Sequence, residues 1–101
     1  PKFTDQFVGL TPRAADWLVR KKFSLIGIDY LSIDAPEEPS LPVHRTLLSN
    51  GLIVVEGLNL SMVKEGQYHL ICLPMKVGGL EGAPARVILL KDKQFGIDNQ
   101  E

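Results

Sequence analysis

The chain has 101 residues, of which 45% are hydrophobic and 23% are charged, a composition typical of one small globular domain. Eleven basic residues against twelve acidic ones give a formal net charge of −1, so no overall field favours nucleic acid or an anionic membrane surface as a partner. No apolar run approaches the roughly 20 residues needed to cross a bilayer, and the composition also excludes intrinsic disorder and a disulfide scaffold.

No internal repeat, low-complexity tract or block of like charges divides the sequence, so we expect a single unit over residues 1–101. Its only cysteine, Cys72, cannot form an internal disulfide, and from the first residues we expect no signal peptide. A cytoplasmic location is therefore the expectation. The polar residues 91–101 are expected to fray.

The first predicted elements are a helix and a strand. Thr11 is a suitable N-cap and Pro12 a suitable first helical residue, and apolar residues at helical spacing follow, which predicts a helix over residues 12–21. The short apolar segment 23–28 predicts a buried strand.

Residues 29–42 contain three prolines and four acidic residues, a composition that predicts a long loop, and long loops in compact domains are often functional. Pro42 can start a second helix through Leu48, and Asn50-Gly51 is a helix-terminating signal. The apolar run 52–55 then predicts a buried strand that ends immediately before Glu56.

Two further strands are predicted in the second half. A turn-rich connector over residues 58–66 leads to a strand over 67–75, and a glycine-rich loop separates it from a last strand over 85–90. The order of helices and strands predicts an α/β fold in which helices flank a mixed sheet.

The strong self-contained motifs of enzyme chemistry are missing: a P-loop, a dinucleotide-binding glycine motif, a zinc-binding H-E-x-x-H, paired C-x-x-C motifs and a nucleophile elbow. His44 and Glu56 are the more informative pair, because they bracket one short helix and its following strand, a unit that can bring both side chains together. A neutral imidazole and a carboxylate are suitable ligands for zinc or manganese.

Spacing alone favours simpler interpretations of this pair, namely a surface histidine and a solvated glutamate. Two ligands also leave a catalytic metal site incomplete, because such sites usually have three protein ligands and an open position. His69 is an alternative ligand, although its place within a strand favours a side chain on the less buried face of a sheet.

Three polar residues follow the first predicted strand, at the end where α/β sheets commonly bind ligands. Asp29, Ser32 and Asp34 are therefore candidate substrate-binding residues. Each of them is equally suited to turn chemistry, in which the side chain accepts a hydrogen bond from a nearby backbone N–H.

Several sequence blocks occur together in one consistent order. The blocks are AADWL (14–18), LIGID (25–29) with Ser32 and Asp34, LPVHRTLL (41–48), VVEGLNL (54–60) and YHLICLP (68–74). In this order and spacing they resemble the C-terminal half of the cyclase family of metal-dependent hydrolases, which includes bacterial kynurenine formamidases (arylformamidases) and isatin hydrolases. The resemblance runs from about residue 11 to residue 90.

The resemblance implies part of a swivelling β/β/α-type domain, with its sheet left incomplete. It implies that His44 and Glu56 complete a site for zinc or manganese, and that the intact enzyme hydrolyses an amide-type bond of a small-molecule substrate by metal activation of water. The family's other ligands and its acid/base histidine lie in an N-terminal H-x-G-T-H-x-D-x-P-x-H block that this chain does not contain. The segment IDAP (33–36) imitates only its D-x-P part.

We therefore expect a C-terminal portion of such a hydrolase, truncated, proteolysed or genetically split, that holds no catalytic residue and is inactive by itself. Its partners would be the missing N-terminal segment or further copies of itself, because half a domain exposes sheet edge and apolar surface. The alternatives are an interaction module that retains the cyclase scaffold without catalysis, and an unrelated small α/β binding domain.

Overall fold

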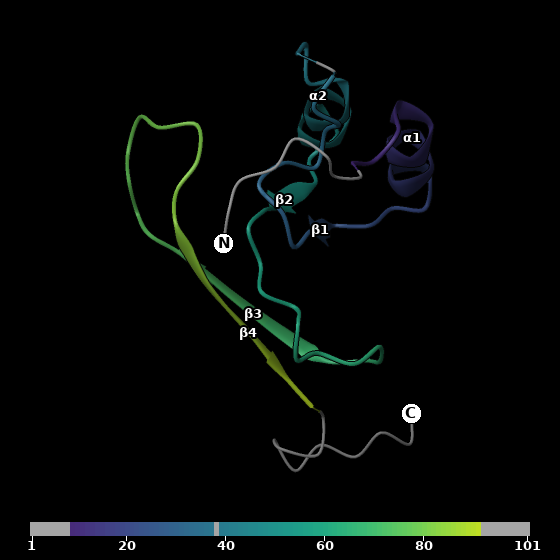
Figure 1. Ribbon diagram of the computed structural model, residues 1–101. Helices are drawn as coiled ribbons and strands as arrows, with labels where there is room; N and C mark the ends of the chain where they lie inside the picture. Colours follow the sequence, from purple (N-terminus) through teal and green to yellow (C-terminus); the bar gives the residue numbers. More distant parts are fainter. Residues whose placement is uncertain (1–8, 38, 92–101) are drawn as a thin grey trace. The chain divides into compact units, whose positions relative to one another are not determined.

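Figure 1 shows the computed structural model, which describes residues 9–37 and 39–91. The chain divides into two compact units, Pro1–Ser61 and Met62–Glu101. Helices and strands alternate in the first unit, which confirms the predicted α/β class. Parallel and antiparallel pairings both occur, as predicted, but in two separate two-stranded sheets. That residues 1–101 act as one unit stays a prediction, and apart from Lys91 the tail expected to fray lies outside the described residues.

The first helix, α1, spans Pro12–Arg20 and begins as the sequence predicts. The Thr11 hydroxyl accepts a hydrogen bond of 3.0 Å from the backbone N–H of Ala14, and Pro12 occupies the first turn, where a missing N–H costs nothing. Arg20 places a positive charge in the last turn, where it complements the helix dipole.

Replacing the Thr11 cap should weaken this helix measurably. In Thr11→Ala the N–H of Ala14 loses its partner, and we expect the free energy of unfolding to fall by about 1 kcal/mol. Urea unfolding followed by circular dichroism measures the loss. Thr11→Ser keeps the hydroxyl and should stay close to the wild-type value, so an equal loss in both variants would contradict the capping role.

Two short parallel strands and a second helix complete the first unit. Strand β1 spans Leu25–Gly27, α2 spans Pro42–Ser49 and β2 spans Ile53–Val55, with Ile26 paired to Val54 in the middle of the register. Both strands are shorter than predicted. Phe23 lies before β1, where its ring is 5.9 Å from that of Trp17.

The helices pack together beside the β1–β2 pair (Figure 1). The residues buried among them share an apolar character and come from α1, the long loop, α2 and the position just before β2: Ala15, Leu18, Ile33, Val43, Leu47 and Leu52. This core fixes the first turn of α2 and the position of β2, and hence the side chains of His44 and Glu56. No helix among the described residues is long and apolar enough to span a bilayer.

The second unit is a β-hairpin. Strand β3 (His69–Pro74) pairs antiparallel with β4 (Ala85–Leu90), so that Ile71 faces Ile88. Several large apolar side chains of this unit are exposed, among them Leu70, Leu73, Met75, Leu80 and Ile88.

Candidate metal centre

The structure brings together the imidazole of His44 and the carboxylate of Glu56. His44 lies in the first turn of α2 and Glu56 follows β2 directly. The distance between Nε2 of His44 and Oε2 of Glu56 is 2.8 Å, and both side chains are partly exposed, by 19% and 28%. The compact helix–strand unit therefore delivers both groups to one point, as the spacing indicates.

Backbone pairing past β2 holds Glu56 in place. The N–H of Ile28 donates a hydrogen bond of 2.9 Å to the carbonyl oxygen of Val55, and the N–H of Gly57 donates one of 2.7 Å to the carbonyl oxygen of Tyr30. The residues on both sides of Glu56 are therefore bonded to the segment that follows β1. Oε2 of Glu56 also accepts a hydrogen bond of 2.8 Å from the N–H of Ile33. This carboxylate oxygen is thus fixed by the long loop as well as by the strand.

Asp34 contacts the other side of the His44 ring. Its Oδ2 lies 2.6 Å from Nδ1 of His44 and accepts the backbone N–H of the same residue at 2.9 Å, while Oδ1 accepts the N–H of Val43 at 2.8 Å. The Asp34 side chain is only 1% exposed. The imidazole therefore lies between two carboxylates, and both contacts are hydrogen bonds when each ring nitrogen carries a proton.

Several proteins are similar in sequence to this chain, although no family model matches it. Over 92 residues it is 44% identical to cyclase-like protein 3 of Oryza sativa subsp. japonica. This alignment covers 89% of this chain and 34% of the rice protein. Over 88 residues it is 38% identical to the kynurenine formamidase of Salinibacter ruber, covering 87% of this chain and 42% of that protein.

A solved structure described as a potential metal-dependent hydrolase with cyclase activity superposes with a TM-score of 0.81 at 40% identity, over 86% of this chain and 43% of that one. This chain is a homologue of the cyclase-like proteins and kynurenine formamidases. The resemblance seen in the sequence is thereby confirmed. The fold is that of part of a cyclase-like hydrolase domain, and the chain spans about a third to two-fifths of the curated relatives it matches.

This homologue of the cyclase-like proteins carries a donor pair that fits a divalent metal, because an imidazole nitrogen and a carboxylate oxygen face one point. Within residues 9–37 and 39–91, no group of three or more His, Cys, Asp or Glu side chains is placed to hold a metal ion. The roles of His44 and Glu56 as metal ligands stay predictions.

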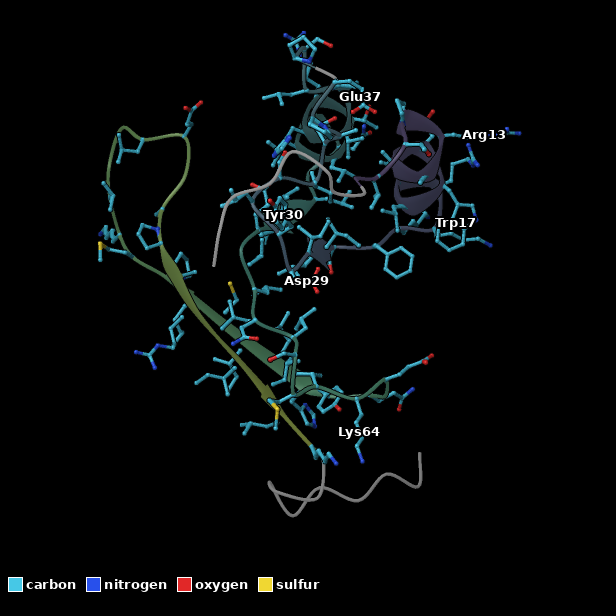
Figure 2. The ribbon with its side chains drawn as sticks, viewed as in Figure 1. Arg13, Trp17, Asp29, Tyr30, Glu37 and Lys64 are labelled. Carbon is cyan, nitrogen blue, oxygen red and sulfur yellow. The ribbon has the colours of Figure 1, made fainter. Side chains whose placement is uncertain are left out.

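The candidate substrate-binding residues have different surroundings. Asp29, labelled in Figure 2 just past β1, is exposed. Ser32 accepts a hydrogen bond of 3.2 Å from the backbone N–H of Asp34, which is the turn chemistry weighed as its alternative role. Asp34 is buried against the start of α2. Contact of these three residues with substrate stays a prediction.

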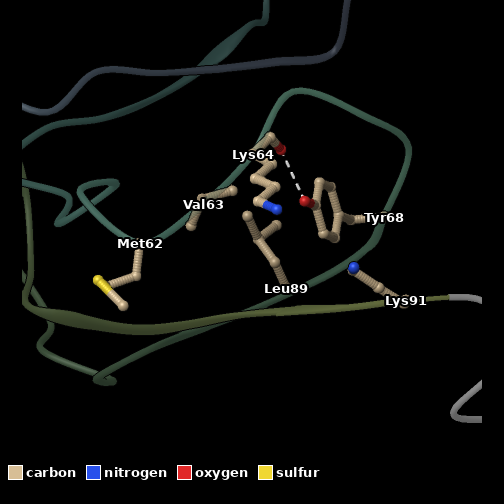
Figure 3. Close-up of a pocket in the computed structure, with 6 residues that line it drawn as sticks. All are labelled: Met62, Val63, Lys64, Tyr68, Leu89 and Lys91. Atoms are coloured by element: carbon tan, nitrogen blue, oxygen red, sulfur yellow. Dashed lines mark hydrogen bonds between the residues drawn. The ribbon is translucent and has the colours of Figure 1, made fainter.

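His69, the alternative ligand, belongs to the first strand of the hairpin and is half-buried. The same unit contains a cavity of about 300 Å³ (Figure 3), lined by Met62, Val63, Lys64, Tyr68, Leu89 and Lys91. The Tyr68 hydroxyl donates a hydrogen bond of 2.6 Å to the carbonyl oxygen of Lys64 across this cavity (Figure 3). Its lining combines apolar side chains with the Tyr68 hydroxyl and the side chains of two lysines, which are unsuited to binding a metal cation.

Burial and hydrogen bonding act in opposite directions on Asp34. Burial raises the pKa of its carboxyl, but the backbone N–H groups of His44 and Val43 and the His44 ring outweigh it, so the pKa of Asp34 lies below the ordinary aspartate value. A carboxyl with a lowered pKa in the folded state stabilises the fold above its unfolded pKa of about 3.9. That stabilisation is lost as the pH falls through the folded pKa.

Acid should therefore abolish the contribution of Asp34 to stability. We expect wild type to exceed Asp34→Asn in unfolding free energy by a constant amount near pH 5 and by progressively less below about pH 4. Urea unfolding of both proteins between about pH 5 and pH 2 measures the difference. A difference that grows on acidification would contradict the direction of the pKa shift.

Proposed function

We propose that this chain supplies His44 and Glu56 to the metal centre of a hydrolase that cleaves amide-type C–N bonds, with arylformamides as the substrate class. The observation that carries the proposal is the 2.8 Å approach of the imidazole Nε2 to the carboxylate Oε2. The names of the homologues, kynurenine formamidase and metal-dependent hydrolase, support the reaction class.

When bound, zinc or manganese would lower the pKa of a coordinated water and polarise the substrate carbonyl. The residues of this chain hold and orient the ligands. Core packing fixes the first turn of α2, which carries His44, while the N–H of Ile33 holds the Glu56 carboxylate. A catalytic zinc site usually has three protein ligands, so His44 and Glu56 would form part of the site.

The remaining ligands and the acid/base group would come from a histidine-rich N-terminal segment, and this chain would be inactive by itself. The exposed apolar side chains of the hairpin, such as Leu70, Leu73 and Ile88, are suited to association with that segment or with another copy of the chain. A cytoplasmic location belongs to the same proposal.

Metal titration of this chain assembled with the complementary N-terminal segment tests the proposal. Isothermal titration calorimetry with Zn²⁺ or Mn²⁺ should show binding that His44→Ala and Glu56→Gln each weaken by about a hundredfold or more, because loss of a supporting group alone costs about 10–100-fold. Glu56→Gln preserves the shape and an acceptor for the Ile33 N–H.

The matched control is Glu37→Ala, which removes an exposed carboxylate of the same unit and should leave affinity unchanged. Unchanged affinity in His44→Ala or Glu56→Gln would overturn the metal-centre proposal.

The second candidate function is an interaction module that keeps the scaffold without catalysis. It is favoured by the exposed apolar hairpin and by the presence of only two candidate metal ligands at one point of the described chain. An assembled complex that is stable by light scattering but binds no metal and releases no product from an arylformamide would support the module over the hydrolase.

A further inference from the structure

The carboxylate of Asp34 connects two features that are usually supported separately, the start of a helix and the orientation of a candidate ligand. All three of its described donors belong to the first turn of α2: the N–H of Val43, the N–H of His44 and Nδ1 of the His44 ring. These donors reach it from nine and ten residues further along the chain, across the proline-rich loop.

Helix α2 needs this distant carboxylate because its own N-cap residue does not cap it. Leu41 has a left-handed backbone with φ of 53° and makes no side-chain cap hydrogen bond. The first N–H groups of a helix lack partners within the helix, and a negative charge near them is favourable. Asp34 supplies both an acceptor and a charge to this end of α2.

The same contacts limit the orientation of the His44 ring. Oδ2 of Asp34 accepts the backbone N–H of His44 and also faces Nδ1 of its ring at 2.6 Å, so one oxygen atom contacts both the backbone and the ring of this residue. When Nδ1 carries the ring proton and donates it to Asp34, Nε2 is the nitrogen left facing Glu56, 2.8 Å away. In metal sites, a carboxylate on the second ring nitrogen fixes the tautomer and direction of the ligand.

We infer that Asp34 is a positioning residue for the metal centre: it holds His44 with Nδ1–H donating to its carboxylate, so that Nε2 is presented to the metal together with Glu56. This inference rests on the proposed function. It differs from the substrate-binding role suggested by the sequence, since Asp34 acts through His44. The Asp34 side chain is only 1% exposed, which is consistent with such an indirect role.

The test combines metal affinity with a signature of the ring itself in Asp34→Asn, within the same assembled protein. Calorimetry with Zn²⁺ should show affinity about 10–100-fold weaker than wild type. Long-range ¹H–¹⁵N spectra of the metal-free protein should be recorded in a Glu56→Gln background, so that no carboxylate faces Nε2, and at a pH high enough that the ring shifts no longer change. They should show the Nδ1–H tautomer while Asp34 is present. The variant should lose this preference.

Thr11→Ala is the matched control, because it removes a helix cap from the same unit without contacting His44. It should leave both the tautomer and the Zn²⁺ affinity unchanged. Equal affinity losses in Thr11→Ala and Asp34→Asn would overturn the inference, as would a wild-type tautomer in Asp34→Asn.

The two proposals fail in different ways. Strong Zn²⁺ binding that requires Glu56 but not Asp34 would overturn the positioning role and leave the metal centre standing. A wild-type complex that binds no Zn²⁺ would overturn the metal centre, and the ring spectra would then show separately that Asp34 holds His44, or overturn that as well.

Discussion

Leu47→Ala is expected to destabilise the first unit by about 2–5 kcal/mol, a large part of the stability of a small domain. The Leu47 side chain is fully buried in the core that α2 shares with α1 and the long loop. Truncation to alanine removes buried methyl and methylene groups and leaves a cavity that neighbouring side chains fill only in part.

Leu48→Ala is a close control for this substitution. Leu48 is the next residue of the same helix and its side chain is 54% exposed, so we expect a change of less than about 1 kcal/mol. Urea unfolding of both variants measures the difference, and similar losses at the two positions would contradict the assigned face of α2.

Gly9→Ala should also destabilise the fold, through the loop that carries Asp34. A Cβ atom at Gly9 would lie 2.5 Å from the backbone nitrogen of Ala35 and 2.7 Å from the carbonyl carbon of Asp34. Backbone atoms cannot rotate away as a side chain does, so either the loop or the segment before α1 must shift. We expect a loss of about 1–3 kcal/mol, as for other overpacked sites.

The shift should also disturb the bridge between Leu10 and the loop, where the N–H of Leu10 donates to Ile33 at 2.8 Å. Gly78→Ala is the control, since no atom lies within 4 Å of a Cβ built there. It should change the unfolding free energy by no more than about 0.5 kcal/mol. A neutral Gly9→Ala would show that the close approach at this position is dispensable.

Local signals in the sequence predict the elements of the fold well. The Thr11-Pro12 start of α1 and the Asn50-Gly51 end of α2 are short-range features, since caps depend on neighbouring residues. Strand length is less predictable, because an apolar residue such as Phe23 can place its ring beside that of a helix residue, here Trp17, without entering a ladder. The division into two small sheets depends on long-range pairing that no local pattern encodes.

The candidate site is predictable only in part for the same reason. His44 and Glu56 bracket a single helix–strand unit, so their spacing indicates proximity, and the structure places them together. The role of Asp34 depends on how the proline-rich loop folds back onto α2, which spacing does not reveal. One signal was available: α2 begins at Leu41-Pro42 without a Ser, Thr, Asp or Asn cap, which indicates that its acceptor comes from elsewhere.

The sharing of one carboxylate between a helix start and a histidine ring has a consequence for protein engineering. Random mutagenesis screened for heat resistance would reject changes at Asp34 on folding grounds before any effect on reactivity could be observed. Substitution of Leu41 by asparagine or glycine should stabilise the fold independently, because these residues adopt the left-handed backbone of this position with less strain. The stability gained at position 41 would allow substitutions of Asp34 to be tested for their effect on reactivity without unfolding the protein.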